Sequence, residues 1–470
     1  MVFNSLIFLF AFLPFVLIGN FLWRNKVWQN SILFLASLIF YAWGEGSMVI
    51  ILIVSILVNY LLGLLIDKSR SASLRKRWLV AGIVLNLGTL IYFKYTEFFV
   101  GVINDLLSLI NLNPIQLTDF PDLPIGISFY TFQSLSYLVD VSRRHVKAQK
   151  SFINLGLYIS LFPQLIAGPI VRYQEIDRQL LGRSFKIENF NKGIRRFIIG
   201  LGKKVIIADS IAYVVDQIFA LEMSNLSTPL AWFAAIGYGI QIYFDFSGYS
   251  DMAIGLGRMF GFKFPENFNY PFRAVSIKDF WRKWHITLSV WFRDYLYFPM
   301  GGNKKGKYRT LINLFTVFFV VGLWHGASWN YVNYGLYMGI FIVLEKHYFD
   351  KLLVKLPRVV QTIYMLFLIN IGWVIFRLED SSMLNEFLSI MFSPSVSENQ
   401  YTIAMFTNSY QLVILFIGAV LSFPVLEHFK INKLIHRIPF VDWLVYSVIF
   451  TYSIFEIINS VYSPFIYFRF

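Results

Sequence analysis

The chain has 470 residues, of which 57% are hydrophobic and only 14% are charged. About one quarter of the residues in an ordinary soluble domain are charged, so this composition favours a membrane protein. The sequence contains no cysteine, which excludes disulfides, cysteine zinc sites and thiolate nucleophiles. The net charge of +14 comes from basic residues in short loops between apolar runs. The positive-inside rule accounts for them, so we predict no nucleic-acid partner.

Apolar runs recur from one end of the chain to the other. A bilayer core needs about 20 apolar residues per helix. Such runs lie at 4–22, 30–44, 47–66, 78–95, 124–142, 193–220, 228–256, 309–323, 330–345, 358–377, 409–426 and 441–462. Because a few are short, we predict an all-α, polytopic membrane protein with roughly 11 transmembrane helices. No domain boundary or low-complexity stretch interrupts the pattern, so residues 1–470 are predicted to form one multi-pass domain.

The loops between the first runs alternate in charge. Basic clusters follow the first, third and fifth runs, and the loops between them carry acids such as Glu45 and Glu97. The basic side is therefore predicted to be cytoplasmic, with the N-terminus outside. The same alternation leaves the C-terminus outside, so we predict a multi-pass protein of a bacterial cytoplasmic membrane.

Residues 152–171 break this alternation. They are apolar enough to span, but the basic residues that follow, such as Arg172 and Arg178, should also be cytoplasmic. Pro163, Gly168 and Pro169 interrupt a helix here. We predict a re-entrant segment, and non-helical backbone at membrane depth is tolerated only where protein or a wet cavity covers it.

Residues 238–273 place two aspartates, Asp245 and Asp251, in an apolar run. A carboxylate there must face protein or water. Two roles are open: either aspartate orients a histidine, or both pair with a cation such as Arg258.

Residues 276–302 interleave charged residues with aromatic ones. Trp281, Trp284, Leu288 and Trp291 fall on one helical face. We therefore predict one amphipathic helix at the cytoplasmic interface, with His285 within it. The segment is either a plain surface anchor or a site where Arg282 and Lys283 receive an anionic donor such as a phosphate-bearing carrier.

His325 follows Arg309 by 16 residues in an apolar run, which corresponds to roughly 24 Å of helix. An ionisable group at such depth marks a candidate functional site. The alternative is a neutral histidine satisfied by a neighbouring carbonyl. The other four histidines lie beside basic loops, where a solvated interfacial role suffices.

Two histidines 40 residues apart make a poor zinc site without a third ligand, so no metal is predicted. Neutral histidine is the most common general base near neutral pH. Activating a hydroxyl to attack a thioester needs one base and a donor for the oxyanion. His325 fits the base, with Trp324, Asn330 or a backbone amide as the donor.

Four stretches of the sequence then point to a family. They are "LPIGISFYTFQSLSYLVDV" (123–141), "FPQLIAGPIVRYQEI" (162–176), the segment 243–302 that ends "FWRKWHITLSVWFRDYLYFPMGG", and "GLWHGASWNYVNYG" (322–335). Together they resemble the membrane-bound O-acyltransferase family, in the branch of alginate and peptidoglycan O-acetyltransferases. The resemblance covers most of residues 120–345. It implies a helical ring around a central funnel, with His325 as the family's invariant histidine and His285 as the second catalytic-region position.

The resemblance also implies the chemistry and its partners. An acyl thioester, acetyl-CoA or a loaded carrier, would be used from inside as a donor substrate, with no permanently bound cofactor. The acetyl group would reach a cell-wall or exported polysaccharide, often through a separate extracytoplasmic SGNH-type transferase. The alternatives are D-alanyl transfer to teichoic acid, a transporter or flippase that uses His325 and Asp245 as a proton relay, and a non-catalytic scaffold.

The last residues, "FIYFRF" (465–470), resemble the C-terminal peptide of the small membrane partner in D-alanylation systems. There a tyrosine is thought to carry the acyl group, so Tyr467 is a candidate acyl carrier on the outer face. The alternative is an aromatic anchor at the membrane interface.

Overall fold

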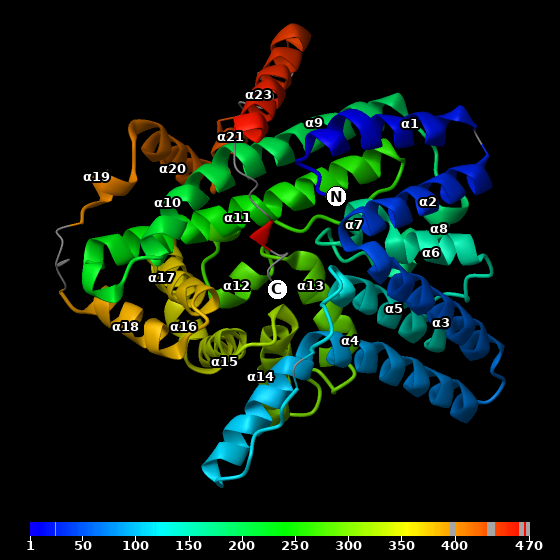
Figure 1. Cartoon of the computed structure of the whole chain (residues 1–470), viewed down its shortest axis with the longest axis horizontal. Coiled ribbons are helices and arrows are strands. Elements are labelled where there is room, and N and C mark those ends of the chain that lie inside the picture. The colour runs from blue at the N-terminus through cyan, green and yellow to red at the C-terminus, as the bar shows by residue number, and fades with distance from the viewer. Residues whose placement is uncertain (24, 118, 395–400, 430–437, 460–464, 467–470) are drawn as a thin grey trace. The chain divides into compact units, whose positions relative to one another are not determined.

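The structure is a computed structural model that describes residues 1–23, 25–117, 119–394, 401–429, 438–459 and 465–466. Every regular element among these residues is a helix (Figure 1), which confirms the all-α class. The chain divides into two compact units. Unit 1 comprises Met1–Ile194 and Ala253–Pro265, and unit 2 comprises Arg195–Met252 and Glu266–Phe470.

Unit 1 is built from helices of the N-terminal part of the chain. They are α1 (Leu13–Leu22), α2 (Lys26–Glu45), α3 (Val49–Lys68), α4 (Ala72–Leu109), α5 (Ile127–Ser142), α6 (Phe152–Ser160), α7 (Phe162–Leu165), α8 (Tyr173–Leu181) and the start of α9 (Ile187–Gly202). The apolar stretch from Lys26 to Lys68 is interrupted at Gly46, where φ is +54°. Glycine adopts this backbone readily, so the runs predicted at 30–44 and 47–66 form two helices.

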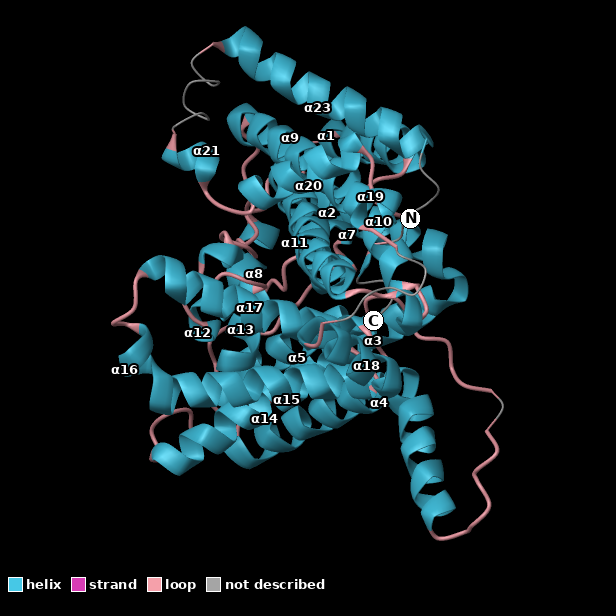
Figure 2. Ribbon diagram, turned by 90° about the vertical axis from the view of Figure 1, so that its left-hand side faces the viewer, coloured by secondary structure: helices cyan, strands magenta, loops and turns pink. Residues whose placement is uncertain are grey.

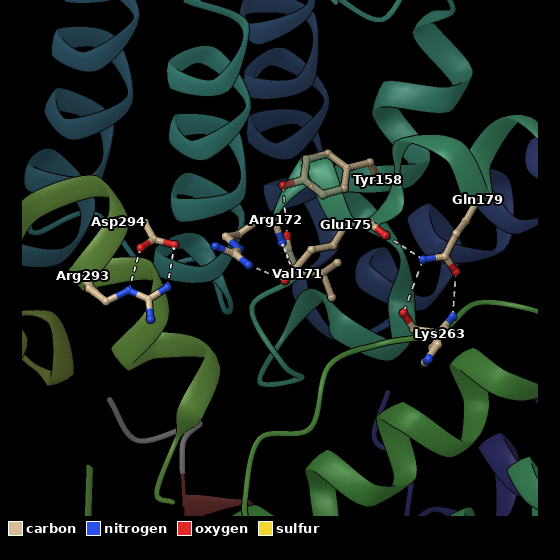
Figure 3. A network of polar contacts seen from close by, with 8 residues as sticks. All are labelled: Tyr158, Val171, Arg172, Glu175, Gln179, Lys263, Arg293 and Asp294. Carbon is tan, nitrogen blue, oxygen red and sulfur yellow. Dashed lines mark hydrogen bonds and ion pairs between the residues drawn. The ribbon is translucent and has the colours of Figure 1, made fainter. Parts of the chain in front are cut away.

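The segment expected to be re-entrant is broken as its prolines require. Helix α6 ends at Ser160, and Pro163 lies in the first turn of α7. Every residue from 155 to 171 is buried. The Tyr158 hydroxyl lies 3.0 Å from the Val171 carbonyl oxygen (Figure 3). Gln164 donates to the Tyr158 carbonyl oxygen (2.7 Å). Protein therefore covers this irregular backbone, as a segment at membrane depth needs.

Polar contacts also fasten the loop around Lys263 within unit 1. The Gln179 side chain on α8 accepts from the backbone N–H of Lys263 (2.7 Å), and Arg172 pairs with Glu175 (2.6 Å) (Figure 3). The first contact ties the loop that follows α11 to α8, and the second lies at the start of α8.

Unit 2 is built from helices of the C-terminal part of the chain. They are α10 (Asp209–Phe219), α11 (Thr228–Met259, whose residues from Ala253 belong to unit 1), α12 (Ile277–Trp281), α13 (Ile286–Phe292), α14 (Lys307–His325), α15 (Trp329–Leu344), α17 (Arg358–Arg377), α18 (Ser381–Phe392), α20 (Ser409–Leu421) and α23 (Pro439–Asn459).

Helices α14 and α15 lie side by side (Figure 2). A methyl group at Gly322 would collide with the Tyr331 carbonyl oxygen, and one at Gly335 would collide with the Phe318 carbonyl oxygen. Only glycine permits this approach. The resulting hairpin fixes the end of α14, where His325 lies.

The described residues include five helical stretches long and apolar enough to cross a membrane: Lys26–Lys68, Ala72–Leu109, Lys307–His325, Arg358–Arg377 and Phe440–Asn459. Phe8–Leu22 and Ser409–Leu421 are apolar but shorter. The stretch Lys26–Lys68 contains both α2 and α3. These helices fit a multi-pass membrane protein, while the count of about 11 spans stays a prediction.

The expectation of one amphipathic helix over 276–302 is wrong. The segment contains α12, a turn, α13 and a short π-helix, η6 (Arg293–Tyr297). The break lies at His285, whose φ is +42°. Trp281, Trp284, Leu288 and Trp291 are all buried. The apolar spacing is thus satisfied by two short helices.

Candidate active site

His285 lies where the backbone turns between α12 and α13. Its left-handed conformation (φ +42°, ψ +54°) is uncommon for a residue other than glycine. Its carbonyl oxygen accepts the backbone N–H of Ser289 (3.1 Å), so it begins α13. Residues held in sparsely populated conformations cluster at functional sites. The turn directs a fully buried imidazole into unit 2.

Asn267 fixes the orientation of this imidazole. Its Oδ1 accepts the backbone N–H of Thr287 (3.3 Å) and the Thr287 hydroxyl (2.9 Å), and it lies 3.1 Å from His285 Nδ1. The Asn267 side-chain amide nitrogen donates to the Ser250 hydroxyl on α11 (3.0 Å). Because a backbone N–H can only donate, the atom facing His285 is an oxygen, and Nδ1 must carry the proton. The other ring nitrogen, Nε2, therefore holds the lone pair in the neutral ring.

The surroundings of His285 favour its neutral form. Burial is the main cause and the neighbouring His325 ring the second, and together they hold the pKa of His285 well below its ordinary value. Burial disfavours the protonated imidazole because the charged form loses its hydration. The surroundings of His285 therefore favour a ring that accepts a hydrogen bond through its lone pair.

His325 is the last residue of α14 and is 4% exposed. Its ring packs edge-on against Phe376 (5.2 Å between centroids) and Tyr334 (5.9 Å). The next residue, Gly326, is extended, and a side chain there would collide with the Tyr331 ring. The chain can thus reverse at once into α15, leaving the imidazole at the end of the helix.

The Trp324 ring lies close to both histidines. Its ring centroid is 5.1 Å from that of His325 and 5.8 Å from that of His285. Phe246 on α11 packs edge-on against His285 at 4.7 Å. The structure therefore brings together three of the residues predicted from the sequence, His285, His325 and Trp324, from α13 and α14.

A wall of aromatic rings surrounds this group. Trp373 on α17 lies 4.9 Å from Trp284 and stacks on Tyr334 at 5.7 Å. Phe280 of α12 stacks on Trp284 at 5.5 Å. Helix α12 is held in turn by the buried Glu345, which accepts the backbone N–H groups of Ile277 and Lys278. Such apolar surroundings strengthen the electrostatic interactions of any group within them.

The two aspartates of α11 pair with cations. Asp245 lies 2.7 Å from the ammonium of Lys204, which also pairs with Asp209. Asp251 binds Arg196 (2.6 Å) and Lys203 (2.8 Å). The sequence left two roles open for these aspartates, orienting a histidine or pairing with a cation. The structure shows pairing, with Lys204 for Asp245 and with Arg196 and Lys203 for Asp251.

The remaining candidates lie apart from the histidine pair or serve the fold. The Asn330 side chain donates to the Phe376 carbonyl oxygen (2.8 Å), which ties α15 to the end of α17. Arg282 is exposed, and Lys283 pairs with Asp279. Further along, Arg293 binds its neighbour Asp294 (2.7 Å) (Figure 3). Tyr467 lies outside the described residues.

Sequence reasoning missed Asn267, Phe246 and Phe376, which contact the histidines, and Lys204, which pairs with Asp245. Asn267 precedes His285 by 18 residues, and only the turn at His285 brings their side chains together. No spacing rule identifies such a pair. Among the described residues, no group of three or more histidine or carboxylate side chains could hold a metal ion.

Comparison with known proteins identifies the family. Residues 7–393 match the model of the membrane-bound O-acyltransferase family. The chain is 41% identical to the probable alginate O-acetylase AlgI of Pseudomonas aeruginosa, over 84% of this chain and 75% of that protein. It is 36% identical to the peptidoglycan O-acetyltransferase of Helicobacter pylori, over 80% and 77%. It is also 32% identical to the teichoic acid D-alanyltransferase of Bacillus subtilis, over 48% and 60%.

The chain therefore belongs to the membrane-bound O-acyltransferase family, and it is an acyltransferase. Both His285 and His325 lie within the matched residues.

Proposed function

We propose that this acyltransferase takes an acetyl group from a cytoplasmic thioester, acetyl-CoA, and passes it outward for O-acetylation of an exported or cell-wall polysaccharide. The relatives of highest coverage are named for alginate and peptidoglycan O-acetylation. The single observation that carries the proposal is the contact of Trp324 with two buried imidazoles, His285 and His325.

His325 acts as the general base in this proposal. It is the slightly exposed member of the pair, whereas His285 is fully buried. As the acceptor hydroxyl attacks the thioester carbonyl, the hydroxyl proton passes to the His325 ring. The C–S bond then breaks, and CoA leaves as the thiol after taking that proton. A base in this position contributes about 10²–10⁴-fold to the rate.

His285 supports the reaction through its oriented ring. With Nδ1 bound to Asn267, its Nε2 is an acceptor that can hold a proton of the acceptor hydroxyl or of a bridging water. The oxyanion needs a donor, for which the Trp324 indole N–H and a backbone amide remain candidates. Asn330 is a weaker candidate because its amide nitrogen already donates to Phe376.

The acceptor in the membrane step is Tyr467 in this proposal. An acetyl ester on the Tyr467 phenol, formed with release of CoA, would carry the group to the outer face. An extracytoplasmic SGNH-type transferase would then move it to the polysaccharide. The exposed Arg282 would assist by binding donor phosphates at the cytoplasmic interface.

The absence of cysteine provides a clean test. Because the chain carries no thiol, a thiol reagent added to purified protein and acetyl-CoA reports only released CoA. We expect the parent chain to release CoA in a single burst, one CoA for each Tyr467 acetylated, and His325→Ala to lower the rate of that burst at least about 100-fold. His428→Ala, at an exposed histidine of the same unit, is the matched control and should keep the parent rate. Equal rates in His325→Ala and the parent would contradict the proposal.

The same assay separates the alternative functions. The D-alanyltransferase relative suggests D-alanyl transfer as a second candidate. It would require a D-alanyl thioester to be used in preference to acetyl-CoA. A transporter or flippase would move its substrate without releasing CoA and without leaving a covalent label on protein or glycan.

A further inference from the structure

Two residues of the C-terminal tail lie buried in unit 2. Phe465 is 4% exposed and Ile466 is 7% exposed. The Phe465 ring stacks on Tyr249 of α11, with centroids 4.6 Å apart and planes 22° from parallel. It also lies 5.9 Å from the Phe246 ring. An anchor in the membrane interface would leave such rings on the lipid-facing surface, so these contacts indicate a specific seat for the tail.

A buried carboxylate completes this seat. The backbone N–H of Ile466 donates to Asp245 Oδ2 at 2.9 Å. The other oxygen, Oδ1, lies 2.7 Å from the Lys204 ammonium. Because Lys204 is shared with Asp209, one cation faces two carboxylates, and Asp245 accepts a second donor from the tail. Buried charges need such donors, and a hydrogen bond to a carboxylate is stronger than one between neutral groups.

The seat and the histidine pair share a residue. Phe246 contacts Phe465 on one side and His285, at 4.7 Å, on the other. On α11, successive residues are turned by about 100°, which places Asp245 and Tyr249 on one strip and Phe246 and Ser250 on the next. Asp245 and Tyr249 contact the tail. Phe246 contacts both the tail and His285, and Ser250 accepts a hydrogen bond from Asn267, the partner of His285.

The short π-helix η3 (Lys203–Ala208) carries Lys204, the cation of the pair with Asp245. It places consecutive lysines on different aspartates of α11, Lys203 on Asp251 and Lys204 on Asp245. Irregular turns of this kind are frequent at functional sites. Asp251 pairs with Arg196 and Lys203, whereas Asp245 pairs with Lys204 and accepts the backbone N–H of Ile466.

We propose that Lys204 and Asp245 form a tail clamp, which holds residues 465–466 of the chain's own tail near His285 by binding the backbone at Ile466, with Tyr249 and Phe246 receiving Phe465. Lys204 and Asp245 are positioning residues here, since they act through the peptide that they hold. Binding through a backbone N–H fixes the register of the tail, and the next residue in the chain is Tyr467. The inference rests on the proposed function only in taking Tyr467 as the acyl acceptor.

Crosslinking tests the clamp in a background without cysteine. Tyr249→Cys with Phe465→Cys should be joined efficiently by a short bifunctional thiol reagent in the full-length protein. The control pair is Tyr238→Cys with Phe465→Cys, because Tyr238 lies about 16 Å further along α11. A crosslinking yield no higher in the first pair than in the control pair would overturn the proposal.

Residue 466 then isolates the hydrogen bond. In the crosslinking pair, Ile466→Pro removes the N–H that Asp245 accepts, whereas Ile466→Ala keeps it. We expect the yield to fall at least about tenfold in Ile466→Pro and to stay near the parent value in Ile466→Ala. Both substitutions lie in the tail and leave the ion pairs of α11 in place, so folding can be checked by thermal unfolding and gel filtration. Equal yields in the two variants would contradict the clamp.

A third variant separates the clamp from the carrier. Tyr467→Phe should keep the crosslinking yield and lose acetylation of the tail. If it loses neither, the clamp stands and the carrier role of Tyr467 fails. If Ile466→Pro keeps the crosslink while Tyr467→Phe loses acetylation, the carrier stands and the clamp fails.

Discussion

The histidine pair and the ion-pair network are two buried polar regions of unit 2 with opposite chemistry. His285 contacts an amide oxygen and aromatic rings, and His325 lies among aromatic rings. Asp245 and Asp251 each have a cationic nitrogen within 2.8 Å. The carboxylates are held by the cations that they bind, whereas a neutral imidazole offers a ring nitrogen with a lone pair, which a general base needs. The difference separates groups suited to hold structure from groups suited to move protons.

The first prediction concerns activity. We expect His285→Ala to lower CoA release about 100-fold, because the oriented imidazole is lost, with folding of the variant checked by gel filtration. Asn267→Ala should lower the rate less than His285→Ala does. The His285 ring remains in this variant, but without Asn267 it can change tautomer. A parent rate of CoA release in His285→Ala would contradict a role for His285 in the reaction.

A second prediction concerns stability. Asp251→Ala leaves the cations of Arg196 and Lys203 without their shared carboxylate. Removing one partner of a buried pair costs about 3 kcal/mol or more, so the free energy of unfolding should fall by that amount. Glu266→Ala is the control, because Glu266 also binds Arg196 but is 47% exposed, and exposed pairs contribute about 1 kcal/mol or less. An unchanged unfolding transition in Asp251→Ala would show that the ion pairs of Asp251 do not stabilise the fold.

The smallest expected effect is on pH dependence. The pKa of His285 is lowered by burial and by His325. The unfolded chain therefore takes up a proton near the ordinary imidazole pKa of about 6.5, which the folded chain does not. Stability should be complete above that pH and fall as the pH drops below it. His285→Gln should flatten this part of the profile of unfolding temperature against pH, and an unaltered profile would count against a buried neutral His285.

Much of this arrangement could be predicted from single residues. The apolar run at 309–323 predicted a helix, and the structure has one at Lys307–His325. The spacing of Trp281, Trp284, Leu288 and Trp291 correctly marked buried positions, yet it concealed the turn at His285. Hydrophobic periodicity reports which side chains are buried and is insensitive to a reversal that keeps them buried.

The partners of the polar residues were harder to foresee. Asp245 pairs with Lys204, 41 positions earlier, because the π-helix η3 turns that lysine towards α11. The hydrogen bond from Ile466 to Asp245 joins residues 221 positions apart. Such pairings depend on how helices pack, and no local pattern in the sequence encodes them.

The most direct test of the account is the mass of the C-terminal peptide after the purified protein is incubated with acetyl-CoA in the absence of a partner transferase. We predict one acetyl ester on Tyr467 in the parent chain and none in His325→Ala. A parent chain that releases CoA while its tail stays unmodified, or a tail that is acetylated equally in His325→Ala, would contradict the account.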